Sequence, residues 1–102
     1  MRGLAAALAL ALAQPPAFAQ EDVGRKVFTE LAQPPCGLCH ALKAAGTEGT
    51  IGPSLDELRP DKARVEEAVR KGLGAMPPFA GKLTPEQIEA VSAFVARTAG
   101  KP

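Results

Sequence analysis

The stretch Cys36-Gly37-Leu38-Cys39-His40 constrains this chain more than any other part of its sequence. Successive residues of a helix are about 100° apart, so residues separated by three or four positions share one side. Cys36, Cys39 and His40 would therefore project into one sector. Two thiols in that sector can bond the two vinyl groups along one edge of a haem, while the imidazole next to them reaches the iron. For this reason C-x-x-C-H is an attachment site for c-type haem.

Three other interpretations use the same residues. A structural disulfide between Cys36 and Cys39 suits an exported protein, but it leaves His40 without a role. A thioredoxin-like redox pair also begins as C-x-x-C, yet it follows a strand in a βαβ unit, and no strand pattern is visible here. Zinc needs four ligands, and the chain has only two Cys and one His, so a carboxylate would have to join them. The sequence favours haem, with a thiol–disulfide oxidoreductase as the main alternative.

The first 19 residues predict a secretory signal peptide. Arg2 precedes an apolar run at residues 4–13, and the small residues Ala17 and Ala19 occupy the two positions that signal peptidase recognises. A retained membrane anchor is the alternative, but the run is shorter than the roughly 20 apolar residues of a span. We therefore expect cleavage after Ala19 and a mature protein in the bacterial periplasm without a membrane span.

The mature chain, residues 20–102, is expected to be one small domain. Removing 19 of 102 residues leaves 83, and a domain of that size is marginal when it relies on its own core. Its aromatic residues are Phe28, Phe79 and Phe94, with no Trp and no Tyr. A large apolar cofactor would supply the missing core.

The balance of charge argues against nucleic acid and anionic membranes as partners. The chain has 12 Lys and Arg, hence 11 without Arg2, against 11 Asp and Glu. These charges are spread along the sequence, and no basic run marks a polyanion-binding surface.

Hydrophobic spacing predicts an all-α fold with long loops, since no segment shows sustained alternation with a period of two. The expected helices run from Glu21 to Ala32, from Cys36 to about Ala45, from Pro60-Asp61 to about Gly72, and from Thr84 to just before Gly100. Their expected apolar faces are Val23, Val27, Phe28 and Leu31 in the first, Val65, Ala68 and Val69 in the third, and Ile88, Val91, Phe94 and Val95 in the last. Thr84 and Gln87 predict a capping box, with Pro85 at the first helical position.

An iron atom held by His40 has one further axial position. The side chains that usually fill it are a second His, a Cys thiolate, a Met or a Tyr. His40 is the only His, both Cys are committed to the haem, Tyr is absent, and Met1 leaves with the signal peptide. Met76 is then the one methionine that remains, and we predict that it is the second iron ligand. Its alternative role is to fill a gap in the core, the commonest use of Met.

The segment Gly72–Phe79 around Met76 has the composition of a loop. Pro77 favours an extended backbone at Met76 and, with Pro78, limits the freedom of the loop, which lowers the cost of ordering it. Thioether ligation raises the reduction potential of the iron. An iron with both axial positions filled has no open site for a substrate, so we expect outer-sphere electron transfer rather than catalysis by this chain alone.

With these features the sequence resembles the class I cytochromes c over nearly all of residues 20–102. The resemblance implies helices wrapped around one covalent haem, with an N-terminal helix that crosses a C-terminal helix. In that family a Gly and an aromatic residue of the first helix meet an aromatic residue of the last. Gly24, Phe28 and Phe94 match these roles.

The segment Gly52-Pro53-Ser54-Leu55 matches the family's Gly-Pro-x-Leu element. The resemblance implies that the Pro53 carbonyl accepts a hydrogen bond from the second ring nitrogen of His40, which fixes the tautomer and strengthens the ligand. Gly-Pro is also an ordinary turn signal, and both roles can hold together. The chain departs from the family in lacking the Trp and Tyr that often help hold a haem propionate. Candidates for that role are Arg59, Lys62 and Arg64.

The stretch from Thr47 to Leu58 is also similar to small cytochromes that take electrons from bacterial sulfite dehydrogenases. That similarity implies a sulfite dehydrogenase as the electron donor. We expect a monomeric one-electron carrier that forms transient complexes with a dehydrogenase and with an oxidase or reductase. The alternatives are a cytochrome subunit held in a periplasmic oxidoreductase complex and, in another class, the thiol–disulfide oxidoreductase.

Overall fold

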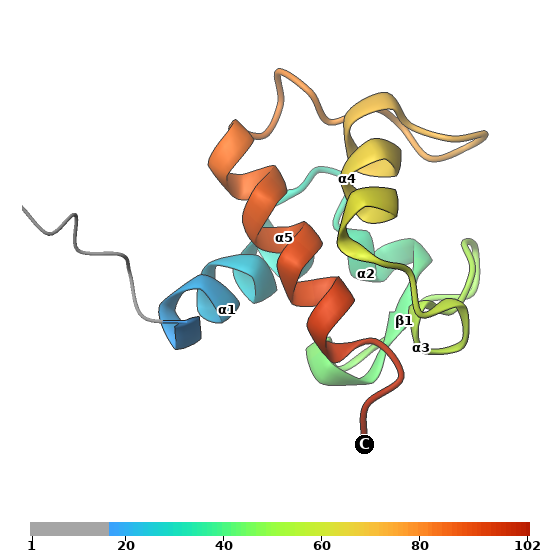
Figure 1. The fold of residues 1–102 in the computed structure, drawn as a ribbon. Coiled ribbons are helices and arrows are strands. Elements are labelled where there is room, and N and C mark those ends of the chain that lie inside the picture. Colours follow the sequence, from blue (N-terminus) through green and yellow to red (C-terminus); the bar gives the residue numbers. More distant parts are fainter. Residues whose placement is uncertain (1–16) are drawn as a thin grey trace, which may run out of the picture.

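The computed structural model describes residues 17–102, which form helices joined by long loops and one small sheet (Figure 1). The helical elements in this range are α1 (Ala17–Lys26), its π-helical continuation η1 (Val27–Leu31), α2 (Cys36–Cys39), the 3-10 turn η2 (Lys43–Ala45), α3 (Leu55–Leu58), α4 (Lys62–Lys71) and α5 (Pro85–Thr98). The strands are β1 (Ala41–Leu42) and β2 (Thr47–Glu48). None of the helices in residues 17–102 is both long and apolar enough to span a membrane.

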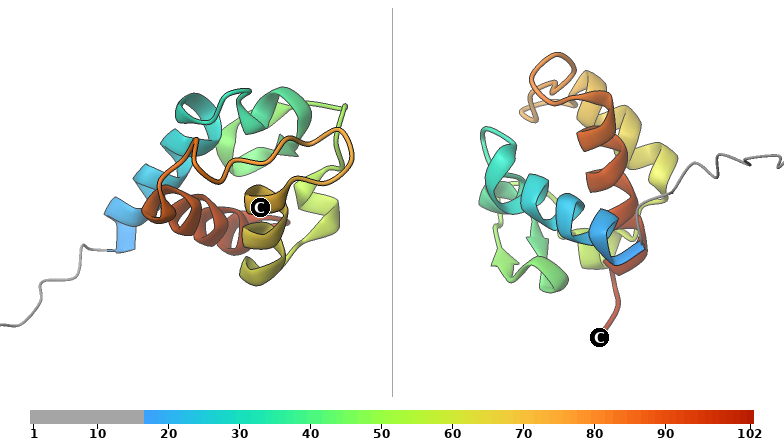
Figure 2. Two further views of the ribbon diagram at one scale, coloured as in Figure 1. Left: turned by 90° about the horizontal axis from the view of Figure 1, so that it is seen from above. Right: turned by 90° about the vertical axis from the view of Figure 1, so that its left-hand side faces the viewer.

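Helix α1 crosses α5 at close range (Figures 1 and 2). A Cβ atom on Gly24 would lie 2.4 Å from the Ala90 carbonyl oxygen and 2.5 Å from Cβ of Phe94, so only glycine fits at the crossing. One turn further, the rings of Phe28 and Phe94 pack edge to face with their centroids 6.1 Å apart. The three residues meet as the resemblance implies.

Two of the four residues expected on the apolar face of the first helix are not buried. Val27 and Phe28 are buried, but Val23 and Leu31 are 45% and 41% exposed. The crossing at Gly24 turns that side of α1 towards α5, and Val23 lies about 100° away from it around the helix. Beyond Lys26 the helix widens to π-helical geometry, which changes the angular spacing and takes Leu31 off the buried face.

The expected helix from Cys36 to about Ala45 is also wrong. It ends at Cys39, and His40 is extended, with φ −112° and ψ 131°. The chain then forms β1, which pairs antiparallel with β2 in the register Leu42 opposite Thr47. The Thr47 hydroxyl stabilises this turn, because it donates to the His40 carbonyl at 2.9 Å and accepts from the Leu42 amide at 3.1 Å. The fold is therefore mostly helical with a small sheet, and each strand is too short to show a period of two.

The last two helices follow their predicted signals. Asp61 caps α4 by accepting from the Arg64 amide at 2.8 Å. The capping box of α5 is complete, with the Gln87 amide 3.1 Å from the Thr84 hydroxyl and the Thr84 amide 2.9 Å from the Gln87 side chain. These helices pack against each other, and α5 also packs on α1. The largest side chains buried between the elements are Phe28, Phe94, Leu42, Val27, Val91 and Val95.

Candidate cofactor site

The two cysteines lie on α2 and form no disulfide. Cys36 packs against the core, and burial raises its pKa to about 11. The attacking cysteine of a thiol–disulfide enzyme needs the opposite, a pKa lowered towards neutrality by a helix terminus or a positive neighbour. The environment of Cys36 therefore does not favour a redox dithiol.

The imidazole of His40 is fixed by the segment that begins at Gly52. Its Nδ1 lies 2.7 Å from the Pro53 carbonyl oxygen. A carbonyl can only accept, so Nδ1 carries the proton and Nε2 keeps a free lone pair for a metal. The hydrogen bond that the resemblance implies is thus present. That His40 ligates iron stays a prediction.

Gly52 lies directly beside the imidazole ring. A Cβ atom there would stand 2.7 Å from Cε1 of His40 and 3.0 Å from Nδ1. The Gly52 amide also donates to the Cys39 carbonyl at 2.7 Å. The sequence interpretation gave Gly52 no role beyond its place in the Gly-Pro turn, and it missed Thr47. Neither contact could be predicted from neighbouring residues, because each joins residues on opposite sides of the loop that follows α2.

Met76 lies in the loop between α4 and α5. Leu73 and Met76 exchange two backbone hydrogen bonds of 3.0 Å across a tight turn, with Gly74 at φ 58°. Phe79, which is buried, anchors the far side of the loop through its amide to the Val69 carbonyl at 2.8 Å. Met76 is partly buried and packs against the same core cluster as Cys36. Its ligation of iron remains a prediction.

The segments that carry these residues suit a large apolar group. Residues 31–42, 49–55 and 72–81 contain no Asp, Glu, Lys or Arg. Each exposes one large apolar side chain strongly: Leu38 by 60%, Ile51 by 73% and Leu73 by 76%. Zinc has less support, because in residues 17–102 no three His, Cys, Asp or Glu side chains gather into a metal-binding group. The donor set of two thiols, one imidazole and one thioether fits a haem.

Residues 19–95 match the family model described as "Cytochrome C oxidase, cbb3-type, subunit III". The chain is also similar to a solved structure, the c-type cytochrome SorU from Sinorhizobium meliloti, with 45% identity and a TM-score of 0.77. That similarity covers 82% of this chain and 95% of SorU. This chain belongs to the family of class I c-type cytochromes. No curated protein matches it.

As a c-type cytochrome, the protein binds haem c covalently and functions in electron transfer. Two of the three candidates for holding a haem propionate are engaged elsewhere in the structure. Lys62 pairs with Glu89, and Nε of Arg59 lies 3.4 Å from the Asp56 carbonyl oxygen. The third candidate is Arg64, whose backbone amide is bound by the cap residue Asp61.

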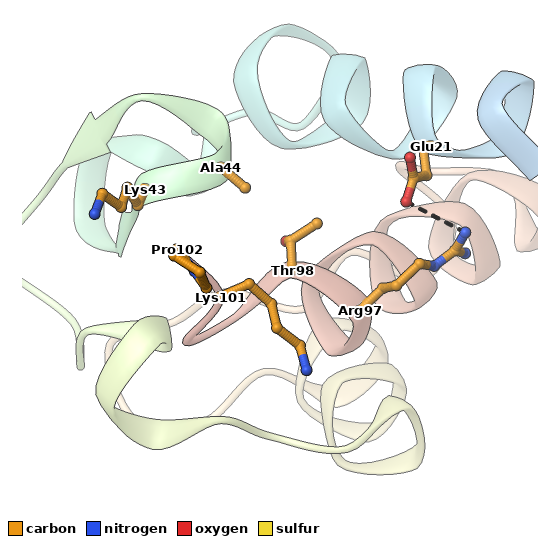
Figure 3. A pocket seen from close by; sticks show the side chains of 7 residues that line it. All are labelled: Glu21, Lys43, Ala44, Arg97, Thr98, Lys101 and Pro102. Carbon is orange, nitrogen blue, oxygen red and sulfur yellow. Dashed lines mark ion pairs between the residues drawn. The ribbon is translucent and has the colours of Figure 1, made fainter.

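A shallow pocket of about 300 Å³ lies away from these residues, where the start of α1, η2 and the end of the chain meet (Figure 3). Its lining is Glu21, Lys43, Ala44, Arg97, Thr98, Lys101 and Pro102. An ion pair of 3.4 Å between Arg97 and Glu21 closes one side. None of the predicted haem-binding residues lines it, so it is not the cofactor site.

Proposed function

We propose that this cytochrome is a periplasmic one-electron carrier with a single haem c. The observation that carries the proposal is the 2.7 Å contact between Nδ1 of His40 and the Pro53 carbonyl, close in the sequence to the two cysteines of α2. In this arrangement Cys36 and Cys39 hold the haem, and Nε2 of His40 binds its iron. The haem supplies an iron that alternates between the ferric and ferrous states. One C-x-x-C-H stretch occurs in the sequence, which supports one haem, with the helices wrapped around it.

Electron transfer without catalysis follows from the proposed ligands. If His40 and Met76 both held the iron, no position would be left free for a substrate. The tight turn from Leu73 to Met76 and the buried Phe79 restrain the loop, so little has to move when the iron changes its oxidation state. A low cost of rearrangement suits a carrier.

The location and the partners are extensions of the same proposal. Most of the predicted signal peptide, residues 1–16, lies outside the described residues, and cleavage after Ala19 stays a prediction. We propose a bacterial sulfite dehydrogenase as the donor, on the similarity over residues 47–58. The description of the matching family, subunit III of an oxidase, favours one alternative, a subunit held in an oxidoreductase complex. Gel filtration of native extract separates a free monomer from such a complex.

An absorption spectrum is the first test. The protein is expressed with the periplasmic haem-attachment machinery, then measured oxidised and reduced. A sharp c-type α-band on reduction and a weak red sulfur-to-iron band on oxidation support the proposal. Met76→Ala should lose the red band and keep the α-band, while Leu73→Ala, a control in the same loop, should keep both. A folded wild-type protein without any haem spectrum would refute the proposal and return the dithiol enzyme to first place.

The donor needs its own assay. Purified ferric protein is mixed with a sulfite dehydrogenase and sulfite, and reduction is followed at the α-band. Reduction that needs both the enzyme and sulfite supports the proposed donor. If a dehydrogenase that reduces another cytochrome c leaves this protein ferric, the partner is wrong while the carrier function stands.

A further inference from the structure

Asp56 is the second residue of α3, and its carboxylate joins two distant parts of the chain. Oδ2 accepts from the Lys43 amide at 2.8 Å, and Oδ1 accepts from the Gly100 amide at 2.8 Å. These donors lie 13 and 44 residues away in the sequence. The two hydrogen bonds, that to Gly100 first, lower the pKa of Asp56. The side chain is therefore an ionised acceptor at neutral pH, with one oxygen for each amide.

The bond to Lys43 continues a row of contacts that begins at the haem-attachment helix. The Gly52 amide donates to the Cys39 carbonyl at 2.7 Å, and His40 Nδ1 donates to the Pro53 carbonyl at 2.7 Å. Lys43 and Asp56 form the next contact along the same two segments. Residues 39–43 and 52–56 are thus tied at three points, and the His40–Pro53 bond is the middle one. Asp56 closes the end that faces away from α2.

The bond to Gly100 attaches this pair of segments to the end of α5. Gly100 has φ 75°, and a Cβ atom on it would lie 2.4 Å from Nε of Arg59, so the chain end packs closely on the residue that follows α3. Ala99, just before it, is buried in the core. Figure 3 shows η2, with Lys43, beside the chain end at Lys101. Through Asp56 the segment beside His40 is therefore fixed to the helix that crosses α1.

We propose that Asp56 is a positioning residue for the axial histidine: by fixing Lys43 and Gly100 it holds the Pro53 carbonyl against Nδ1 of His40. This inference rests on the proposed function, because the imidazole must be an iron ligand for its hydrogen bond to matter to the reaction. A strong bond at Nδ1 makes the ligand more basic and stabilises ferric iron. Loosening the segment weakens that bond and raises the reduction potential.

The test compares two variants that each remove one negative charge from α3. In Asp56→Asn the shape is kept, but one acceptor oxygen becomes an NH₂ donor, so Lys43 or Gly100 loses its partner. Glu57→Gln is the control, because Glu57 is exposed and its carboxylate makes no contact in the described part of the chain. Both variants keep Cys36, Cys39 and His40, and intact mass verifies one haem in each. Redox titration and exchange of the Nδ1 proton in the ferrous protein are the readouts.

We expect Asp56→Asn to have a higher potential than Glu57→Gln. At a fixed electrode potential the ferrous-to-ferric ratio should differ by roughly two- to threefold, which is about 20–30 mV for one electron. The Nδ1 proton should also exchange faster in Asp56→Asn alone. Equal potentials and equal Nδ1 exchange in the two variants, with Asp56→Asn merely less stable, would overturn the inference.

A second variant covers the case in which Asp56→Asn does not fold. Asp56→Glu keeps the charge and both oxygens but places them one methylene further out, and we expect a smaller rise of the potential above wild type. A folded Asp56→Glu protein with the wild-type potential and wild-type Nδ1 exchange counts against the inference. If the wild-type protein carries haem and the variants give these results, only this inference is refuted. If the wild-type protein carries no haem, the proposed function is refuted as well.

Discussion

Replacing Gly52 by alanine tests the geometry of the His40 site most directly. The added Cβ would stand 2.7 Å from Cε1 and 3.0 Å from Nδ1 of His40. Carbon atoms in favourable contact are about 3.5–4.0 Å apart, so the ring has to retreat by roughly 0.8 Å or more. The 2.7 Å bond from Nδ1 to the Pro53 carbonyl can lengthen by only about 0.5 Å before it leaves the usual range of 2.7–3.2 Å, so we expect a retreat of that size to weaken or break it.

The loss has two measurable consequences. The net contribution of one hydrogen bond is about 0.5–1.5 kcal/mol, so the free energy of unfolding of the haem-loaded protein should fall by about that amount. The less basic imidazole should also raise the reduction potential. Covalent haem attachment should be unaffected, because Cys36 and Cys39 are unchanged. Denaturant unfolding, redox titration and the Nδ1 proton resonance of the ferrous protein measure these effects.

Gly46→Ala is the matched control. Gly46 has φ 68° and nothing within 4 Å of an added Cβ, so alanine there is strained without touching His40. A left-handed alanine costs about 1–2 kcal/mol, a loss of stability close to that of Gly52→Ala. The potential and the Nδ1 resonance should change only in Gly52→Ala. If the two variants lose stability alike and neither shifts the potential, the argument that Gly52 keeps the axial histidine in place is refuted.

Three further predictions concern stability. Gly24→Ala should destabilise the haem-loaded protein by about 1–3 kcal/mol in denaturant unfolding, because its Cβ would overlap α5. Val23→Ala, on the exposed face of α1, should cost less. The reverse order would contradict the assignment of Gly24 to the buried face. Thr84→Ala should cost about 1 kcal/mol through loss of the cap of α5, and Thr84→Ser should restore most of it if the hydroxyl is the cause. The double variant Cys36→Ser, Cys39→Ser should be largely unfolded by far-ultraviolet circular dichroism, since the haem supplies much of the apolar core; native-like helicity without haem would show that the core suffices.

The parts of the fold that the sequence predicts are those with local signals. The cap of α5 needs only Thr84, Pro85 and Gln87, which are neighbours, and its apolar face needs only the residues that follow. The end of α2 at Cys39 depends instead on Thr47, whose hydroxyl bonds back to His40 and Leu42 across a turn. Helix α3 has four residues, too few for periodicity, although Ser54 and Glu57 carry the S-x-x-E signature of a helix start.

The candidate site divides in the same way. Cys36, Cys39 and His40 are close in sequence and are predicted as haem-binding residues from the C-x-x-C-H pattern, and elimination among so few ligand types predicts Met76. These assignments stay predictions. The bond from His40 to Pro53 was expected only through the family resemblance, because 13 residues separate the partners. Asp56 was not expected at all. Its two amide donors are non-local, and an aspartate in a polar segment is otherwise an ordinary surface residue.

The structure also separates the contacts that stabilise the fold from the contacts that hold His40. Between residues 36 and 58 only Leu42 and Leu55 belong to the buried cluster, whereas most of its other members lie on η1, α4 and α5. The segment around His40 is held mainly by hydrogen bonds that involve Gly52, Pro53 and Asp56, and one of them fixes the imidazole itself. Packing of α1, η1 and α4 on α5 therefore sets the stability of the framework. On the proposal that His40 binds the iron, the contacts of residues 52–56 set the strength of that ligand. Asp56 bonds to both the His40 segment and the chain just after α5. A shift in the packing of α5 would therefore be passed to the His40 segment through Asp56.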